Sequence, residues 1–254
     1  MACIFHQVAF DPFQGRYILV KLGNYLLIPK IMWSRKEGKL PARLATTELS
    51  KKYDSLLALA PTSFELNAGE IVILSGPNGS GKTTLLTCLS GLIHPSSGTV
   101  TVAGYDLYRD EVEVRRRLVY VPDVPRFYLE LTAWEHLRFI ALANDVKQNF
   151  NERAEVLLRK LGLWEARNLF PHHFSRGMRL KLGLALALIR PFEVLLLDEP
   201  TSALDVEGVE LLIKELRRLR DQGVTILLST HDPNLIHHLG DRRLSIHQGV
   251  IEVA

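Results

Sequence analysis

The sequence predicts an α/β fold, in which a mostly parallel β-sheet carries helices on both faces. Three apolar runs indicate the sheet, namely EIVILS (70–75), VLLLD (194–198) and VTILLST (224–230). Each has the length and composition of a strand that is buried on both faces. Stretches with helical spacing separate the runs, and strands that alternate with helices form parallel sheets. The chain has 254 residues, 47% of them hydrophobic, so it can bury a sizeable core.

The first part of the chain, residues 1–43, differs from the rest in net charge and in the pattern of its apolar residues. It holds seven Lys or Arg and two acids, a net charge of +5, so the remainder carries −2 of the total of +3. Its apolar stretch 17–33 is interrupted by Pro29, which ends or kinks a helix. Three interpretations stay open: an amphipathic element on a lipid surface, an accessory strand and helix packed on the main domain, or upstream sequence read from an early start codon.

From residue 44 the pattern is that of a folded domain, which we expect to end at 252. LATTELSKKY (44–53) predicts an edge strand and turn, and PTSFELNAGEIVILSG (61–76) predicts two strands around a turn. GKTTLLTCLSGL (81–92) predicts a helix that is ended by Gly91 and Pro95. SSGTVTVAGYDL (96–107) predicts a hairpin-like strand pair. An antiparallel β subdomain is also expected.

Helices are expected at 132–144 and 151–161, within a helical subdomain of about 122–190. Asn151 is the predicted N-cap of the second helix, and Leu157, Leu161 and Trp164 repeat at helical spacing. One further helix carries a single apolar stripe and ends at Gly223. The stripe consists of Val209, Leu212, Ile213, Leu216 and Leu219.

Composition excludes several classes of protein. No apolar run reaches the roughly 18 residues of a membrane span. The acidic balance of the body argues against binding to nucleic acid. The two cysteines, Cys3 and Cys88, lie far apart without metal-ligand spacing, as expected for a reducing compartment.

The segment GPNGSGKT (76–83) predicts a phosphate-binding loop, because it matches G-x-x-x-x-G-K-[ST] between a strand and a helix. Its glycines let backbone N–H groups point at phosphate oxygens, and the helix N-terminus adds positive potential. Lys82 would reach the β- and γ-phosphates, and Thr83 would bind Mg²⁺. The core of the fold is therefore predicted to be that of a P-loop NTPase.

Acidic residues follow the buried run at 194–198. Asp198 ends the predicted strand and would hold Mg²⁺. Glu199 comes next, where a carboxylate can orient and deprotonate the attacking water. These two residues predict that the protein hydrolyses a nucleoside triphosphate and does not only bind it.

A second anion site is predicted at FSRGM (174–178). Ser175 is a favoured N-cap residue, Gly177 permits close approach of a backbone, and an apolar helix starts at about Met178. Two such sites on one chain suggest that two chains pack head to tail around each nucleotide. Lys82 would then come from one copy and Ser175 from the other.

Over residues 44–252 the motifs, in this order, resemble those of the ATP-binding cassette (ABC) ATPases. GPNGSGKTT resembles Walker A, FSRGM the signature, VLLLDEP Walker B, SALD (202–205) the D-loop, and STH, ending at His231, the switch histidine. The resemblance implies that Glu199, His231 and Lys82 act in catalysis and that Asp205 communicates between two sites. The nucleotide-binding residues that it implies are Tyr53 (stacking on adenine), Gly76, Pro77, Asn78, Gly79, Ser80, Gly81, Lys82, Thr83, Thr84, Ser175 and Gly177.

Two positions depart from the family pattern. Asp123, in YVPD, stands where the family usually has Gln, and either it joins Thr83 and Asp198 as a metal ligand or it faces solvent. In the signature, Arg176 replaces a Gly and Met178 replaces a Gln. Arg176 would reach the γ-phosphate or bond across the dimer.

The resemblance implies an ATPase with ATP and Mg²⁺ as ligands, working as a homodimer under a membrane permease subunit at the cytoplasmic face of the membrane. Residues 122–143 resemble exporters of the ABC-2 type and would form the groove for a helix of that subunit. Candidate contacts there are Phe127, Tyr128, Leu131 and Trp134, for which core packing is the alternative. Two other functions stay open: an ABC ATPase with a soluble partner, and a nucleotide-gated module without hydrolysis.

Overall fold

The computed structural model describes residues 8–11, 16–19, 42–146 and 148–253 of the chain. Contacts divide the chain into two compact units, Met1–Lys39 and Leu40–Ala254. In the first unit, β1 (Val8–Asp11) pairs with β2 (Arg16–Leu19) in antiparallel fashion. Most of the stretch 17–33, for which the sequence suggests an interfacial or accessory element, lies outside the described residues, as does Cys3.

A six-stranded sheet forms the centre of the second unit, in the order β12-β11-β5-β10-β9-β8. Its strands are β5 (Ile71–Ser75), β8 (Leu118–Val121), β9 (Val194–Asp198), β10 (Thr225–Ser229), β11 (Arg242–His247) and β12 (Val250–Val253). All neighbours are parallel except β11 and β12. Every residue of β5, β9 and β10 is buried, which confirms the interpretation of the three apolar runs.

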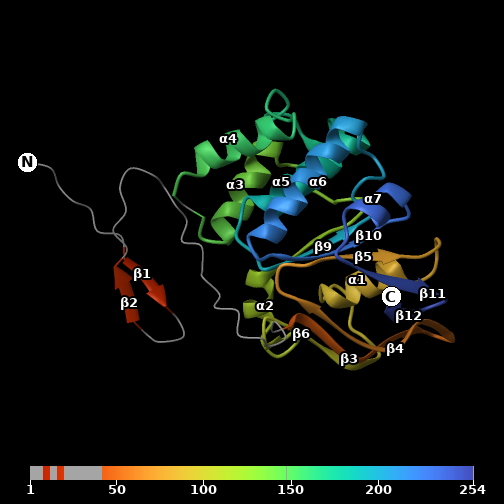
Figure 1. Cartoon of the computed structure of the whole chain (residues 1–254). Coiled ribbons are helices and arrows are strands. Elements are labelled where there is room, and N and C mark those ends of the chain that lie inside the picture. The colour runs from red at the N-terminus through yellow and green to blue at the C-terminus, as the bar shows by residue number, and fades with distance from the viewer. Residues whose placement is uncertain (1–7, 12–15, 20–41, 147, 254) are drawn as a thin grey trace, which may run out of the picture. The chain divides into compact units, whose positions relative to one another are not determined.

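Helices cover both faces of this sheet (Figure 1). They are α1 (Lys82–Leu89), α5 (Arg176–Leu188), α6 (Val206–Asp221) and α7 (Pro233–His238). Side chains alternate between the faces of a strand, so neighbouring residues enter different cores. On β5, Val72 and Leu74 pack in the core that includes α1, whereas Ile71 and Ile73 pack in the core that includes α5 and α6.

An antiparallel sheet in the order β4-β3-β6-β7 packs on the α1 side. Its strands are β3 (Ala42–Tyr53), β4 (Leu56–Asn67), β6 (Ser97–Val102) and β7 (Tyr105–Asp106). The prediction of an edge strand at 44–53 is wrong, because β3 lies between β4 and β6 and pairs with both. A short helix that the sequence analysis did not predict, α2 (Glu111–Arg117), connects this sheet to β8.

A helical segment follows β8 and has a hydrophobic core of its own. It consists of α3 (Ala133–Ala143), α4 (Phe150–Lys160), the 3₁₀ turn η1 (Pro171–His173) and α5. Thr132 and Glu135 form a capping box that starts α3. The predicted N-cap of α4 is wrong: the cap is Asn149, and Asn151 lies within the first turn. In the described part of the chain, no helix has the length and apolar character that a membrane crossing requires.

Candidate active site

The loop between β5 and α1 curls because its glycines permit it. Gly81 precedes α1 with a φ of 111°, in the left-handed region, and a Cβ there would lie 2.7 Å from the carbonyl oxygen of Ala58. A Cβ on Gly76 would lie 2.3 Å from the carbonyl oxygen of Ile246. The backbone therefore approaches two neighbouring segments too closely for any side chain at these positions. Further along the loop, Pro77, Asn78 and Gly79 are exposed, Ser80 is buried and Thr84 is half-buried.

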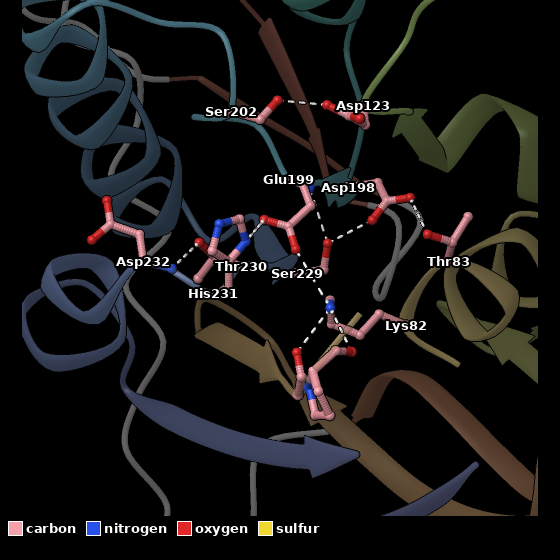
Figure 2. Close-up of polar contacts among 12 residues, drawn as sticks. Lys82, Thr83, Asp123, Asp198, Glu199, Ser202, Ser229, Thr230, His231 and Asp232 are labelled. Atoms are coloured by element: carbon pink, nitrogen blue, oxygen red, sulfur yellow. Dashed lines mark hydrogen bonds and ion pairs between the residues drawn. The ribbon is translucent and has the colours of Figure 1, made fainter. Parts of the chain in front are cut away.

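Lys82, the first residue of α1, folds back across this loop (Figure 2). Its ammonium group donates to the carbonyl oxygens of Gly76 at 2.9 Å and Pro77 at 3.2 Å. It also lies 3.5 Å from Oε1 of Glu199, in an ion pair with both side chains largely buried. The loop thus surrounds a buried positive charge, as a phosphate site requires.

Asp198, at the end of β9, is buried and accepts two short hydrogen bonds. Thr83 Oγ1 donates to its Oδ2 at 2.7 Å, and Ser229 Oγ donates to its Oδ1 at 2.6 Å. Tyr120 Oη lies 3.5 Å from Oδ2. Burial raises the pKa of Tyr120, and the Asp198 carboxylate raises it further, so the phenol keeps its proton and faces Asp198 as a donor.

Glu199 has a backbone conformation that is rare for a residue with a side chain, with φ at 45°. Ser229 holds it there, because its Oγ and its carbonyl oxygen both accept from the Glu199 N–H, at 2.9 and 3.2 Å. Oε2 of Glu199 lies 2.9 Å from Nδ1 of His231, whereas Oε1 is buried without a hydrogen-bond partner. Strain of this kind gathers at functional sites. The result is a fixed carboxylate, one oxygen of which bonds to His231 while the other faces Lys82 without a hydrogen bond.

These contacts bring together Lys82, Thr83, Asp198, Glu199 and His231 in one place (Figure 2). Ser229 and Tyr120, which both contact Asp198, were not predicted from the sequence. A signal for Ser229 does exist: it ends β10 in register with Asp198 at the end of β9. Residues in register at the carboxyl ends of parallel strands lie side by side, so a hydroxyl at that position could have been identified.

Thr83 and Asp198 present hydroxyl and carboxylate oxygens, the ligand type that Mg²⁺ prefers. Within the described residues, no group of three His, Cys, Asp or Glu side chains is arranged to hold a metal. Such a sparse set fits Mg²⁺, which keeps waters and takes substrate phosphates as ligands. Ser80 Oγ is buried in the phosphate loop without a hydrogen-bond partner, so the loop holds an unsatisfied polar atom.

The signature segment forms the N-terminus of α5. Ser175 is the N-cap, and its Oγ accepts from the backbone N–H of Met178 at 3.2 Å. The helix begins at Arg176, two residues earlier than predicted. A Cβ on Gly177 would lie 2.6 Å from the carbonyl oxygen of Ala203, so the helix start packs directly on the turn after β9. Ser175 is exposed, and in the described structure no hydrogen bond joins it to the residues around Lys82.

Asp123, one of the predicted metal ligands, is bonded to the signature segment. Nη2 of Arg176 lies 2.9 Å from both carboxylate oxygens of Asp123. Ser202 Oγ donates to Oδ1 of Asp123 at 2.5 Å and accepts from Nη2 of Arg176 at 3.2 Å. In the described part of the chain, Asp123 makes no hydrogen bond to Thr83 or Asp198.

The two remaining predicted residues lie at the ends of elements. Tyr53 ends β3 and is 43% exposed, and the ammonium group of Lys51 lies 4.9 Å from the centre of its ring. Asp205 is the N-cap of α6 and accepts from the Gly208 N–H at 3.1 Å. That hydrogen bond and the nearby Lys181 hold the pKa of Asp205 below its ordinary value.

A protein-family model described as "ABC transporter" matches residues 59–202. Among curated proteins, the chain is 34% identical to the arginine transport ATP-binding protein ArtM of Bacillus subtilis, over 80% of this chain and 87% of ArtM. It is 35% identical to the SkfA peptide export ATP-binding protein SkfE of the same organism, over 79% of this chain and 84% of SkfE. Among solved structures, it is similar to a dimeric post-hydrolysis state of the ATP-binding cassette MJ0796 bound to ADP and Pi, with a TM-score of 0.75 and 26% identity, covering 83% of this chain and 98% of that one.

Proposed function

The chain belongs to the ABC transporter family as an ATP-binding subunit that hydrolyses ATP, and we propose that two copies of it enclose two ATP molecules, each copy supplying a different half of every site. The observation that carries this proposal is the separation of two anion-binding features on one chain. The phosphate loop converges with Asp198 and Glu199, whereas the exposed N-cap at Ser175 shares no hydrogen bond with Lys82, Asp198 or Glu199 in the described structure.

Lys82 and the loop N–H groups bind the phosphates in this proposal. Lys82 already bonds to two carbonyl oxygens and pairs with Glu199, so it exchanges these partners for phosphate oxygens. Thr83 and Asp198 hold Mg²⁺, which neutralises charge on the phosphates when it is bound. Ser229 and Tyr120 orient the Asp198 carboxylate, because both face its oxygens as donors.

Glu199 acts as the general base in the proposed mechanism. Its Oε1 lies 3.5 Å from Lys82 Nζ and makes no hydrogen bond in the described structure; once Lys82 binds the phosphates, Oε1 accepts a proton from the attacking water. His231 bonds to Oε2 and so fixes the direction in which Oε1 points. His231 is itself 68% exposed, which leaves its other ring nitrogen accessible to a γ-phosphate or to a second copy of the chain. Tyr53, exposed at the end of β3, stacks on the adenine ring.

Dimerisation fits both the comparisons and the surface. ABC cassettes bind ATP and form dimers, as the description of the MJ0796 structure states for that protein. In this chain, α5 points its N-terminus outward at the exposed Ser175, and the positive end of a helix attracts phosphate. We place Ser175 and Gly177 against the ATP that is bound by the second copy, and Asp205 at the interface between the two sites.

A membrane subunit is the proposed partner of the segment after β8. Of the four side chains suggested by the sequence, Tyr128 is exposed, Leu131 is half-buried, and Phe127 and Trp134 pack against the core of the helical segment. Phe139 contacts Tyr128 edge to face and is 47% exposed. Other exposed apolar residues of this segment are Val124, Leu129 and Leu142. Such a group of apolar side chains is suited to receive an apolar helix.

The names of the relatives include arginine transport and peptide export, so the similarity concerns the ATP-binding subunit rather than one substrate or direction. Export therefore stays a proposal that rests on the sequence of residues 122–143. We propose that the chain works at the cytoplasmic face of the membrane through its partner. Replacing the exposed Tyr128 by Glu should lower the fraction of the chain that sediments with membranes, whereas Val156→Glu on α4, equally exposed, should not.

Mixed dimers test the shared site directly. Lys82→Ala and Ser175→Arg should each abolish phosphate release by the full chain. A mixture of the two should regain activity, because one composite site in each mixed dimer has both Lys82 and Ser175 intact. A mixture of Lys82→Ala with the double variant Lys82→Ala/Ser175→Arg has no intact site and serves as the control. If the first mixture stays as inactive as the control although both proteins dimerise with ATP, the shared site is refuted.

A further inference from the structure

Three separate parts of the chain meet in one polar network, formed by Asp123, Arg176 and Ser202. Asp123 lies in the loop after β8, Arg176 is the first residue of α5, and Ser202 lies in the turn after β9. Every pair in the trio is hydrogen-bonded: Arg176 to both oxygens of Asp123, Ser202 to Asp123, and Arg176 to Ser202. Figure 2 shows Asp123 and Ser202 facing each other beside the turn that carries Glu199.

The charge of Arg176 needs this network. An arginine at the start of a helix faces the positive end of the helix dipole, where acidic side chains are favoured instead. α5 has no acidic residue in its first turn, so the compensating charge comes from Asp123, 53 residues away in the sequence. Asp123 in turn is neutralised by Arg176. Each of the two side chains therefore supplies the charge that neutralises the other.

The network lies between residues that serve the two proposed ATP sites. In the proposed dimer, Ser175 of a chain faces the ATP of its partner, whereas Glu199 faces the ATP of its own chain. Arg176 follows Ser175 directly, and the backbone N–H of Ser202 donates to the carbonyl oxygen of Glu199 at 3.1 Å. Beside it, Gly177 contacts the carbonyl oxygen of Ala203. A shift of Arg176 relative to Ser202 thus changes the position of the N-cap at Ser175 relative to the turn of the general base.

We propose that Asp123, Arg176 and Ser202 are positioning residues, which fix the signature turn 174–178 against the turn that carries Glu199. The proposal rests on the proposed ATPase function and extends it. It also assigns Asp123 as the partner of Arg176 and not as a ligand of Mg²⁺. The two departures from the family pattern, at 123 and 176, are then one feature of this chain.

The network fixes the position of the signature turn more than it stabilises the fold. The side chains of Arg176 and Asp123 are 53% and 34% exposed, and ion pairs with this much solvent contribute little to folding. We therefore expect the melting temperature to change by less than about 3 °C on neutralising either residue. Turnover, in contrast, depends on the placement of reacting groups to a fraction of an ångström.

A double-mutant cycle tests the proposal, with Asp123→Asn, Arg176→Gln and the double variant of the full chain. Each single variant should lower kcat for MgATP by about threefold or more, and the double variant should lose no more than the worse single variant. The exchange Asp123→Arg/Arg176→Asp should recover part of kcat, because it restores opposite charges. The Mg²⁺ concentration that gives half-maximal activity should stay the same in Asp123→Asn.

The pair Glu155–Arg159 on α4 is a matched control, because it has similar exposure and an N–O distance of 2.8 Å. Neutralising that pair should leave kcat unchanged. Losses that multiply in the Asp123/Arg176 double variant, or a higher Mg²⁺ requirement in Asp123→Asn alone, would overturn the proposal. A wild-type chain that releases no phosphate would instead refute the ATPase function, and a cycle of melting temperatures would then test the contact by itself.

Discussion

Replacing Glu199 by Gln should stop turnover without weakening ATP binding. The amide has the same shape as the carboxylate and can bond to His231 in either ring tautomer, so the arrangement around His231 survives. What disappears is the negative charge of the carboxylate, and with it the basicity needed to take the proton of the attacking water. General bases contribute about 10²–10⁴-fold to rates, or roughly 3–5 kcal/mol of barrier. We expect kcat to fall by that factor.

Binding should respond in the opposite direction. Before ATP binds, the Lys82 ammonium lies 3.5 Å from Glu199, and at an effective dielectric constant of about 20 that distance corresponds to an attraction of roughly 5 kcal/mol. Solvent and the two carbonyl partners of Lys82 reduce the net strength of this attraction, but the interaction stays favourable. Removal of the negative charge leaves Lys82 more available to phosphate, so the Kd for ATP should stay equal or fall.

The assay compares wild type, Glu199→Gln and Glu210→Gln, an exposed glutamate on α6 that serves as the control. Phosphate release gives kcat, and equilibrium titration with ATP gives Kd. Sedimentation with ATP should also show more dimer for Glu199→Gln, because its ATP persists. A kcat within threefold of wild type would remove Glu199 from the role of base, and a large rise in Kd would show that Glu199 supports binding rather than opposing it.

Three further predictions concern binding, capping and pH. Lys82→Ala should raise the Kd for ATP at least tenfold by titration, since the one buried cation of the described phosphate loop is lost; an unchanged Kd would contradict its role. Ser175→Ala should lower the free energy of unfolding by about 1 kcal/mol in urea, because the cap on Met178 is lost, and Ser175→Asn should restore it. Burial raises the pKa of Glu215, but hydrogen bonds from Arg218 and Lys160 outweigh it and hold the pKa below its ordinary value. A lowered folded-state pKa gives stability that is present at neutral pH and is lost as pH falls below about 4.5. Glu215→Gln should therefore lower the free energy of unfolding by about 1–2 kcal/mol at pH 7, as measured by urea unfolding. On acidification the variant should lose less stability than the wild type, and an equal loss in both would refute this.

Much of the fold could be predicted because the strands next to the site carry simple patterns. β9 is an uninterrupted apolar run that ends in an acid, which is the pattern of a strand buried on both faces. The N-cap of α4 was misplaced by two residues, because Asn149 and Asn151 are the same residue type and residue preference does not distinguish them. The edge position assigned to β3 failed because strand order is a tertiary property.

The site was predicted where one motif carries one role, and missed where residues meet from different parts of the chain. The phosphate loop and the acids after β9 are local patterns that physical chemistry explains. Ser229 was overlooked because a serine at the end of a strand is common, and only the register of β10 against β9 shows its purpose. Both Asp123 and Arg176 were recognised as unusual, but 53 intervening residues hid the fact that they touch.

α3 and α4 pack with one face of α5 in a core of their own, while the other face of α5 packs in the core on the main sheet. A body with its own core can tilt while its interior stays intact, since the contacts that change lie at its boundary. Asp123 and Ser202 meet Arg176 at that boundary. Any swing of the segment during a catalytic cycle would change these bonds together with the packing of α5 on the main sheet, so both act as restraints on how far the segment turns.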